Sequence, residues 1–305
     1  MPSDYSTYSD AEIQEAYAEL YSLYQNGFLF SSDDYEPFAA QMGPAPVKSM
    51  CLNIAHDCNL RCSYCFAAQG DFGHGRKLMP FEVGKAAIDF LIEHSANRHN
   101  LELDFFGGEP LMNFEVVKQV VEYARSIEKE HHKNFRFTIT TNGLLLTDDK
   151  IDYINREMSN VVLSIDGRKE INDSLRFRVD GSGSYGAIVP KYQRLVEKRR
   201  NGKFDQYYVR GTFTKKNLDF TKDVIHMREL GFDQISIEPV VADPELLPIA
   251  LTEEDLPRIY EEYENLQGKL FKEKKGETRS TFSTSCWILT RALRHQTAAR
   301  VQLRQ

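Results

Sequence analysis

The residues best suited to chemistry in this chain are Cys58, Cys62 and Cys65, which lie within eight consecutive positions in the pattern CxxxCxxC. Three thiolates this close together can bind an iron–sulfur cluster. A [4Fe–4S] cube contains one more iron than this loop has cysteines, so one iron would have no protein ligand. An iron with an open coordination position can bind and activate a small molecule, whereas a fully ligated site cannot.

Other uses of clustered cysteines fit less well. A structural zinc site needs a fourth ligand, for which His56 is the nearest candidate, and usually a second cysteine pair, whereas Cys51 and Cys286 are isolated. A disulfide framework fails because three clustered cysteines cannot all pair and nothing indicates export. A thioredoxin-like motif in Cys62-Ser-Tyr-Cys65 would leave Cys58 unused. The spacing therefore favours the open cluster.

The composition limits the class of protein. A length of 305 residues with 41% hydrophobic residues predicts a sizeable core in one large domain or in one domain with appendages. The net charge of −7 and the pI near 5.7 argue against nucleic acid and anionic membranes as partners. The N-terminus has no signal-peptide pattern, and no apolar run approaches the ~20 residues of a membrane helix. We therefore expect a cytoplasmic protein with reduced cysteines.

Short β-rich runs alternate with amphipathic helical stretches from about residue 50 onward. The apolar spacing predicts helices near 80–96, 114–132, 147–158, 186–200 and 218–230. The predicted strands are Met50–His56, Leu101–Phe106, Arg136–Thr141, Val161–Ile165, Tyr207–Phe213 and Gln234–Val240. Runs such as Val161–Ile165 look buried on both faces, as parallel sheets require. This alternation predicts an α/β fold of parallel βαβ units, either a partial (β/α)6 barrel or a doubly wound sheet.

Polar and glycine-rich loops follow four of the predicted strands, where this architecture places its chemistry. The cysteine loop follows the first strand, and Phe106-Gly107-Gly108-Glu109-Pro110 follows the second. The glycines would let a ligand approach the backbone, and Glu109 could accept hydrogen bonds from an ammonium group. The next two strands end in Thr140-Thr141-Asn142-Gly143 and Ser164-Ile165-Asp166-Gly167. Each alone is typical of a tight turn, but together they predict one site.

The cysteine motif with an aromatic residue before its last cysteine, followed by Gly-Gly-Glu-Pro, resembles the radical S-adenosylmethionine enzymes. The motifs match along about residues 48–240. The resemblance implies that the amino and carboxylate groups of S-adenosylmethionine chelate the open iron. It also implies that an electron from the cluster cleaves the cofactor's C–S bond, giving methionine and a 5′-deoxyadenosyl radical that abstracts hydrogen.

The resemblance further implies contacts between this chain and S-adenosylmethionine. The amino group would contact Gly107, Gly108 and Glu109, the ribose Ser164 and Asp166, the adenine Tyr64, and the carboxylate Arg176. Arg178 is the alternative to Arg176 for the carboxylate.

Longer strings narrow the resemblance to the maturases of six-cysteine (SCIFF) peptides: Cys51–Cys62, Asp104–Met112 and Gln234–Val240. Such enzymes link a cysteine sulfur of a ribosomal precursor peptide to the α-carbon of a threonine. The implied partners are a cysteine-rich precursor peptide and a reducing electron donor. The alternatives are a sulfatase-maturase-like enzyme acting on another peptide or protein, and an inactive cluster-binding fragment without the auxiliary-cluster domain.

The two ends of the chain differ from this core. Residues 1–47 form a helical extension, either the remnant of a leader-recognition module or a plain capping helix. The core covers 48–245, and a second helical extension covers 246–277. The segment 278–305 contains five arginines and no acidic residue, which predicts an irregular basic tail. We expect this tail to be the product of a frameshift or truncation near residue 280, with docking of an acidic partner as the alternative.

Three further features have ordinary explanations. Cys51 on the first strand is expected to be a buried small hydrophobe. The basic run Lys198-Arg199-Arg200 closes a helical segment, where the helix dipole favours cations. The acidic stretch from Glu253 to Glu264 is expected to be a solvated helix face.

Overall fold

The chain divides into two compact units, residues 1–46 and 47–305, in a computed structural model that describes residues 8–31, 33, 35–41, 45–242 and 248–274. The first unit contains helices α1 (Asp10–Gln25) and α2 (Glu36–Gln41). Helix α1 begins at a capping box, in which Ser9 and Glu12 exchange hydrogen bonds between side chain and backbone. The predicted tail, 278–305, lies outside the described residues.

A seven-stranded sheet forms the centre of the second unit, in the order β3-β1-β4-β5-β6-β8-β9. Six of its strands are parallel and follow one another in sequence order, and only β3 (Lys77–Leu78) is antiparallel. A separate two-stranded sheet joins β2 (Leu60–Cys62) to β7 (Arg176–Arg178). The parallel strands are β1 (Ser49–His56), β4 (Asn100–Gly107), β5 (Asn134–Thr141), β6 (Met158–Ser164), β8 (Tyr208–Phe213) and β9 (Ile235–Pro239).

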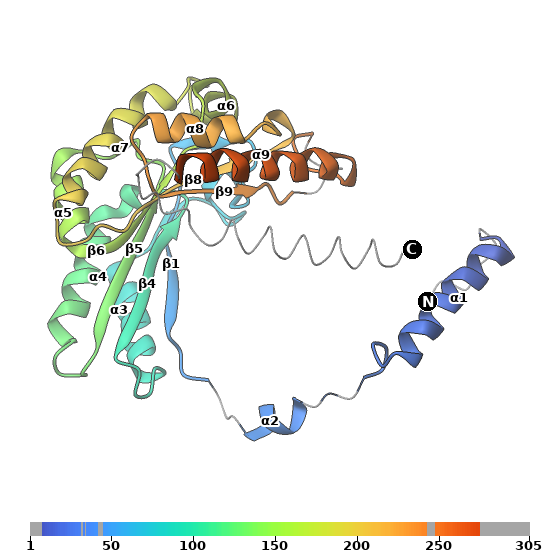
Figure 1. Cartoon of the computed structure of the whole chain (residues 1–305). Coiled ribbons are helices and arrows are strands. Elements are labelled where there is room, and N and C mark those ends of the chain that lie inside the picture. Colours follow the sequence, from blue (N-terminus) through green and yellow to red (C-terminus); the bar gives the residue numbers. More distant parts are fainter. Residues whose placement is uncertain (1–7, 32, 34, 42–44, 243–247, 275–305) are drawn as a thin grey trace. The chain divides into compact units, whose positions relative to one another are not determined.

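The sequential strand order identifies a partial barrel rather than a doubly wound sheet. In a doubly wound sheet the strand order reverses at a switch point, which places helices on both faces. Here successive crossovers lie on the same side, so the helices cover one face of the sheet (Figure 1). These helices are α3 (Phe81–Glu93), α4 (Phe114–Ile127), α5 (Asp148–Glu157), α6 (Lys169–Leu175), α7 (Tyr185–Arg200), α8 (Thr221–Glu229) and α9 (Leu256–Lys274).

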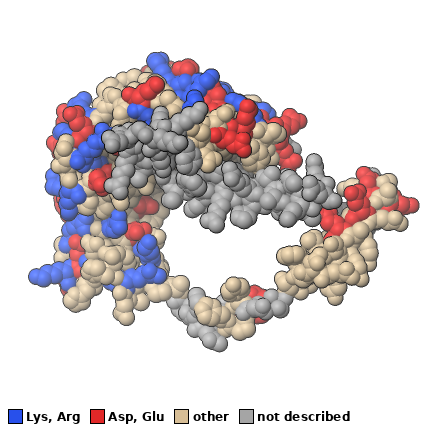
Figure 2. Space-filling view, in the orientation of Figure 1, with Lys and Arg blue, Asp and Glu red and all other residues tan. Residues whose placement is uncertain are grey.

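Short 3-10 helices shape the connections: η1 (Ala68–Gly70), η2 (Pro110–Asn113), η3 (Lys215–Asn217) and η4 (Glu253–Asp255). None of the helices in the described part of the chain is long and apolar enough to cross a bilayer. On the face drawn in Figure 2, Lys and Arg side chains are interspersed with Asp and Glu over the second unit.

The two faces of the sheet differ in polarity. On β4, Leu101, Leu103 and Phe105 point into the core beneath the helices, whereas Glu102 and the exposed Asp104 lie on the opposite face. The expectation of burial on both faces is met by the β6 run Val161–Leu163, whereas burial alternates along β4 and β5. The sheet therefore presents an open, partly polar face, as expected where a ligand must enter.

Cys51 is exposed, so its predicted burial is wrong. Its Cα is in register with that of Asp104 on the neighbouring strand, which places both side chains on the open face. Partial burial and the Asp104 carboxylate raise the pKa of the Cys51 thiol.

Helix α9 is not merely a solvated acidic face. Its residues Ile259, Tyr263 and Leu266 join Phe213 and Phe220 in a second apolar cluster. Phe213 and Phe220 stack with ring centroids 4.4 Å apart. The prediction of a solvated stretch from Glu253 to Glu264 is therefore wrong in part, because one side of α9 is core.

Arg199 is also buried, which the basic run at the end of α7 did not predict. Its side chain is fully inaccessible and donates to the carbonyls of Gln206, Met158 and Ser159 at 2.7–2.9 Å. Burial lowers the pKa of Arg199 to about 10. The guanidinium thus joins the start of β6 to the loop that leads into β8.

Replacing Arg199 tests this role against its exposed neighbour. Arg199→Met leaves two buried carbonyls and the partly buried Gln206 carbonyl without their donor, so we expect the free energy of unfolding to fall by about 3 kcal/mol in urea titrations. Lys198→Met removes an exposed ion pair with Asp152 and should cost about 0.5 kcal/mol. Equal losses in the two variants would contradict the structural role of Arg199.

Candidate metal and cofactor site

One pocket at the carboxyl ends of β1, β4, β5 and β6 gathers almost all of the predicted site residues. Its wall contains Cys58, Cys62, Cys65, Tyr64, Gly107, Gly108, Glu109, Ser164 and Arg176. Asp166 lies outside this lining and contacts Tyr64 from behind. Residues from separate βα units thus meet at the rim where parallel strands end.

The cysteine loop is fixed by backbone hydrogen bonds and by the β2–β7 pair. Cys62 is in register with Arg176, and the Cys58 amide donates to Asp57 Oδ1 at 2.8 Å. Around the first sulfur, the Leu60 amide and the Asn142 side chain donate to Cys58 Sγ at 3.4 and 3.6 Å. Donors aimed at a sulfur favour its thiolate form, which is the form that binds metal.

Burial governs the ionisation of the free thiols. It raises the pKa of Cys58 to about 12 and also raises the pKa of Cys62. Metal binding must therefore displace protons from these sulfurs. Among the described residues, no three His, Cys, Asp or Glu side chains converge in the geometry of a single metal ion. His56 packs its ring against Phe72, with centroids 4.8 Å apart, and is not part of the pocket wall.

The two glycines of the Gly-Gly-Glu loop are required by contact with the backbone that precedes the cysteines. Gly107 has φ +127°, and a Cβ on Gly107 would lie 2.4 Å from the Ala55 carbonyl oxygen. A Cβ on Gly108 would lie 2.1 Å from the Asp57 carbonyl oxygen. The Gly108 and Glu109 amides donate to these same two carbonyls at 2.7 and 2.8 Å. The loop therefore sets the position of the chain just before Cys58.

The Glu109 carboxylate joins the rims of two strands. It is fully buried and accepts from the Leu111 amide at 3.0 Å, from Thr141 Oγ1 at 2.7 Å and from the Asn142 amide at 2.7 Å. Burial raises the pKa of Glu109, although these donors oppose the shift. Since a carboxylate offers about four acceptor positions, one position on Oε2 is left for a further donor.

A chain of hydrogen bonds among Tyr64, Asp166 and Arg176 joins the cysteine loop to the end of β6 and to β7. Tyr64 donates its hydroxyl hydrogen to the buried Asp166 carboxylate, with oxygen–oxygen distances of 2.7 and 2.9 Å. Arg176 Nη1 donates to the Tyr64 oxygen at 2.8 Å, and the Thr212 amide donates to Asp166 Oδ1 at 3.0 Å. Burial raises the pKa of the Asp166 carboxyl.

The pocket fits a cluster with an anionic ligand beside it. Arg176 Nε is buried and has no hydrogen-bond partner among the described residues, so it can donate to a carboxylate. Arg178 Nε is likewise buried without a partner among the described residues, but Arg178 lines a different hollow, with Lys191 and Asn59. The arrangement therefore favours Arg176 as the anion ligand beside the three sulfurs.

Three lining residues were not singled out from the sequence. Asn142 reaches both Cys58 Sγ and Asn59, and Phe66 stacks on Phe106 with centroids 6.1 Å apart. Phe66 directly follows the last cysteine of the motif, and Phe106 directly precedes the two glycines. The adjacency of Phe66 and Phe106 to these motifs is the signal by which the sequence could have identified them.

Comparison with known proteins agrees with this geometry. Residues 47–186 match the family model of the 4Fe-4S single cluster domain. The radical SAM cyclopropyl synthase TigE of Paramaledivibacter caminithermalis is 28% identical over 184 residues, which cover 57% of this chain and 38% of that protein. The cysteine-type anaerobic sulfatase-maturating enzyme of Clostridium novyi is 25% identical over 234 residues, covering 74% and 59%. The chain is thus similar in sequence to enzymes of the radical S-adenosylmethionine superfamily.

The fold of this chain is shared with a solved structure. Native anSMEcpe with bound AdoMet and Cp18Cys peptide superposes with a TM-score of 0.63 at 20% identity, covering 78% of this chain and 63% of that one. The chain spans about 38–59% of the length of the two curated relatives above.

The close contact at Gly108 can be tested by one methyl group. In Gly108→Ala the new Cβ meets a backbone oxygen that cannot move without displacing Cys58, so we expect a loss of about 2 kcal/mol in unfolding free energy and reduced iron content after reconstitution. Gly186→Ala is the matched control, because nothing lies within 4 Å of its Cβ. Stability and iron content in Gly108→Ala equal to those of the control would contradict the contact.

Proposed function

We propose that this protein binds a [4Fe–4S] cluster through Cys58, Cys62 and Cys65, binds S-adenosylmethionine beside it, and cleaves the cofactor reductively. One observation carries the proposal: the three cysteines line one pocket with the Gly-Gly-Glu loop and with Arg176, whose Nε has no partner in the described part of the chain. A buried guanidinium nitrogen next to a three-cysteine wall is a site for an anion held against a metal cluster.

Different residues of the site would bind different parts of S-adenosylmethionine. Arg176 would bind the methionine carboxylate, and the free acceptor position of Glu109 would bind the ammonium group. Ser164 and Asp166 would face the ribose, and Tyr64 the adenine. The reduced cluster and S-adenosylmethionine, when bound, supply a carbon-centred radical that abstracts hydrogen from a substrate. The walls limit access of water to this chemistry.

The first test uses the cysteines themselves. Anaerobically reconstituted protein should contain about four irons per chain and release 5′-deoxyadenosine after reduction with dithionite. Alanine at Cys58, Cys62 or Cys65 should abolish both, because the cluster loses a ligand. Cys51→Ala is the matched control, since Cys51 is an exposed cysteine on the adjoining strand. Cluster and product retained in all three ligand variants would refute the proposal.

The substrate we propose is a ribosomally made, cysteine-rich precursor peptide, cross-linked from a cysteine sulfur to a threonine α-carbon. The long strings that resemble the SCIFF maturases support this, as does the peptide bound in the anSMEcpe structure. The open face of the sheet offers polar side chains to such a substrate, among them Asp104, Arg210 and Glu238, with Arg210 Nε 3.4 Å from Glu238 Oε1. The reaction also needs a reducing electron donor, which is consistent with a cytoplasmic setting.

Residues 1–47 would contribute to peptide recognition. Helix α1 carries exposed aromatic side chains, and Tyr17 and Tyr21 stack with centroids 6.1 Å apart. An amphipathic helix of this kind can receive an apolar peptide segment.

Modification of a cysteine in a sulfatase, without a cross-link, is the second candidate. It is favoured by the Clostridium novyi enzyme, whose match covers more of this chain than the match to TigE. Both candidates use the same cofactors and differ only in the substrate that lies against the open face.

Mass spectrometry separates the two candidates. We expect a co-expressed six-cysteine precursor peptide to lose two hydrogens, about 2 Da, for each thioether formed, with fragments that stay linked in tandem spectra. The cluster-free Cys62→Ala variant is the control and should leave the peptide unchanged. Modification of a cysteine-containing sulfatase peptide, with the precursor left intact, would instead support the second candidate.

A further inference from the structure

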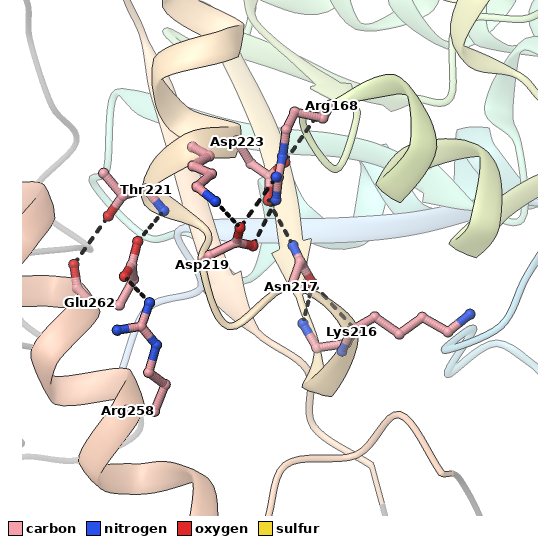
Figure 3. Close-up of polar contacts among 10 residues, drawn as sticks. Arg168, Lys216, Asn217, Asp219, Thr221, Asp223, Arg258 and Glu262 are labelled. Carbon is pink, nitrogen blue, oxygen red and sulfur yellow. Dashed lines mark hydrogen bonds and ion pairs between the residues drawn. The ribbon is translucent and has the colours of Figure 1, made fainter.

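A partly buried ionic network lies next to the turn that follows β6. Arg168 follows the Asp166-Gly167 turn, and its guanidinium lies between Asp219 and Asp223 (Figure 3). Arg168 Nη2 donates to Asp219 Oδ1 at 2.7 Å, and Arg168 Nε donates to Asp223 Oδ1 at 2.8 Å. The sequence analysis singled out none of these three residues.

Asp223 also holds the backbone of the turn. It accepts from the Arg168 amide at 3.0 Å. Gly167 has φ +104°, and a Cβ there would lie 2.2 Å from Asp223 Cβ. Helix α8, on which Asp223 stands, therefore presses against the turn without space for a side chain. The close approach at Gly167 and the hydrogen bond from the Arg168 amide together restrict the position of the turn relative to α8.

The same carboxylate is tied to the rim of β8. Asn217 donates from Nδ2 to Asp223 Oδ2 at 3.1 Å and accepts from the Thr214 amide at 2.8 Å. The rim of β8 in turn reaches the pocket side, because the Thr212 amide donates to Asp166 Oδ1. Asp223 thus connects the two strand ends between which the Asp166 carboxylate lies.

Asp166 links the Asp166-Gly167 turn to the pocket wall through hydrogen bonds. Its oxygens accept from Tyr64, and Tyr64 accepts from Arg176, so a displaced turn would displace both lining residues. We propose that Arg168 and Asp223 are positioning residues for S-adenosylmethionine: by fixing the Asp166-Gly167 turn they set the positions of Tyr64 and Arg176. This inference rests on the proposed function.

A second arginine link to helix α8 provides a matched control. Arg258 of α9 donates to Glu262 Oε2 at 2.9 Å, and Glu262 accepts from the Thr221 amide at the start of α8 (Figure 3). This link also ties an arginine to α8 through a buried carboxylate, but it makes no contact with the β6 turn. Arg258→Gln therefore removes a comparable charge and leaves the turn in place.

The test compares Arg168→Gln with Arg258→Gln in the full chain with its cluster reconstituted. We expect Arg168→Gln to raise the KM for S-adenosylmethionine about tenfold with kcat changed less than about threefold, because the loss is one of binding. The Kd for S-adenosylhomocysteine, measured by calorimetry, should rise by a similar factor. Hydrogen exchange in the peptide spanning residues 162–178 should speed up. Arg258→Gln should leave all of these within about twofold of wild type.

Two further variants keep the test decisive. Asp219→Asn removes only one side of the Arg168 contact and should show a smaller shift, as should Arg168→Lys, which keeps the charge but not the fork of donors. Unchanged KM and Kd in Arg168→Gln and Asp219→Asn, with lowered unfolding midpoints, would reduce the network to a structural role and overturn the inference. Wild-type protein that binds no S-adenosylmethionine would instead overturn the proposed function.

Discussion

The buried carboxylate of Glu109 is the interaction on which the site depends most. An ionised carboxylate without water is stable only when protein donors replace the water, and here two backbone amides and the Thr141 hydroxyl do so. These donors belong to the loops after β4 and β5, so satisfying one charge draws two strand ends together. Asn142, fixed in this way, reaches Cys58 and Asn59. The metal-binding loop is therefore held by a charge that need not touch the metal.

The sheet supplies the second condition for function. Because its parallel strands follow in sequence order, the helices cover one face and leave the other open. The apolar side chains of β4 and β5 fill the covered face, while polar side chains such as Asp104 and Arg210 occupy the open one. The rim pocket thus adjoins a partly polar surface, while the apolar layer beneath the helices stabilises the fold.

Most of the regular structure followed from local patterns. The strand and helix periodicities predicted all six parallel strands and the helices between them to within a few residues, with α6 as the exception. The short strands β2 and β7 were not predicted, because three residues are too few to show a periodicity. Their pairing also joins positions that are far apart in the chain. Arg199 and Cys51 were misjudged for a related reason: their burial depends on neighbours from other elements, which residue type alone does not reveal.

The sequence by itself determined the chemistry of this protein. The spacing of Cys58, Cys62 and Cys65 and the Gly-Gly-Glu loop are local patterns, and a local pattern fixes which groups lie within one loop. Only the tertiary structure decided how these groups are positioned. The place of Arg176 in the pocket wall, the hydrogen bonds of Glu109, and the contact of Arg168 with Asp223, 55 residues away, depend on which strand ends are neighbours. Long-range pairs of this kind form when packing brings their elements together, and no spacing along the chain encodes them.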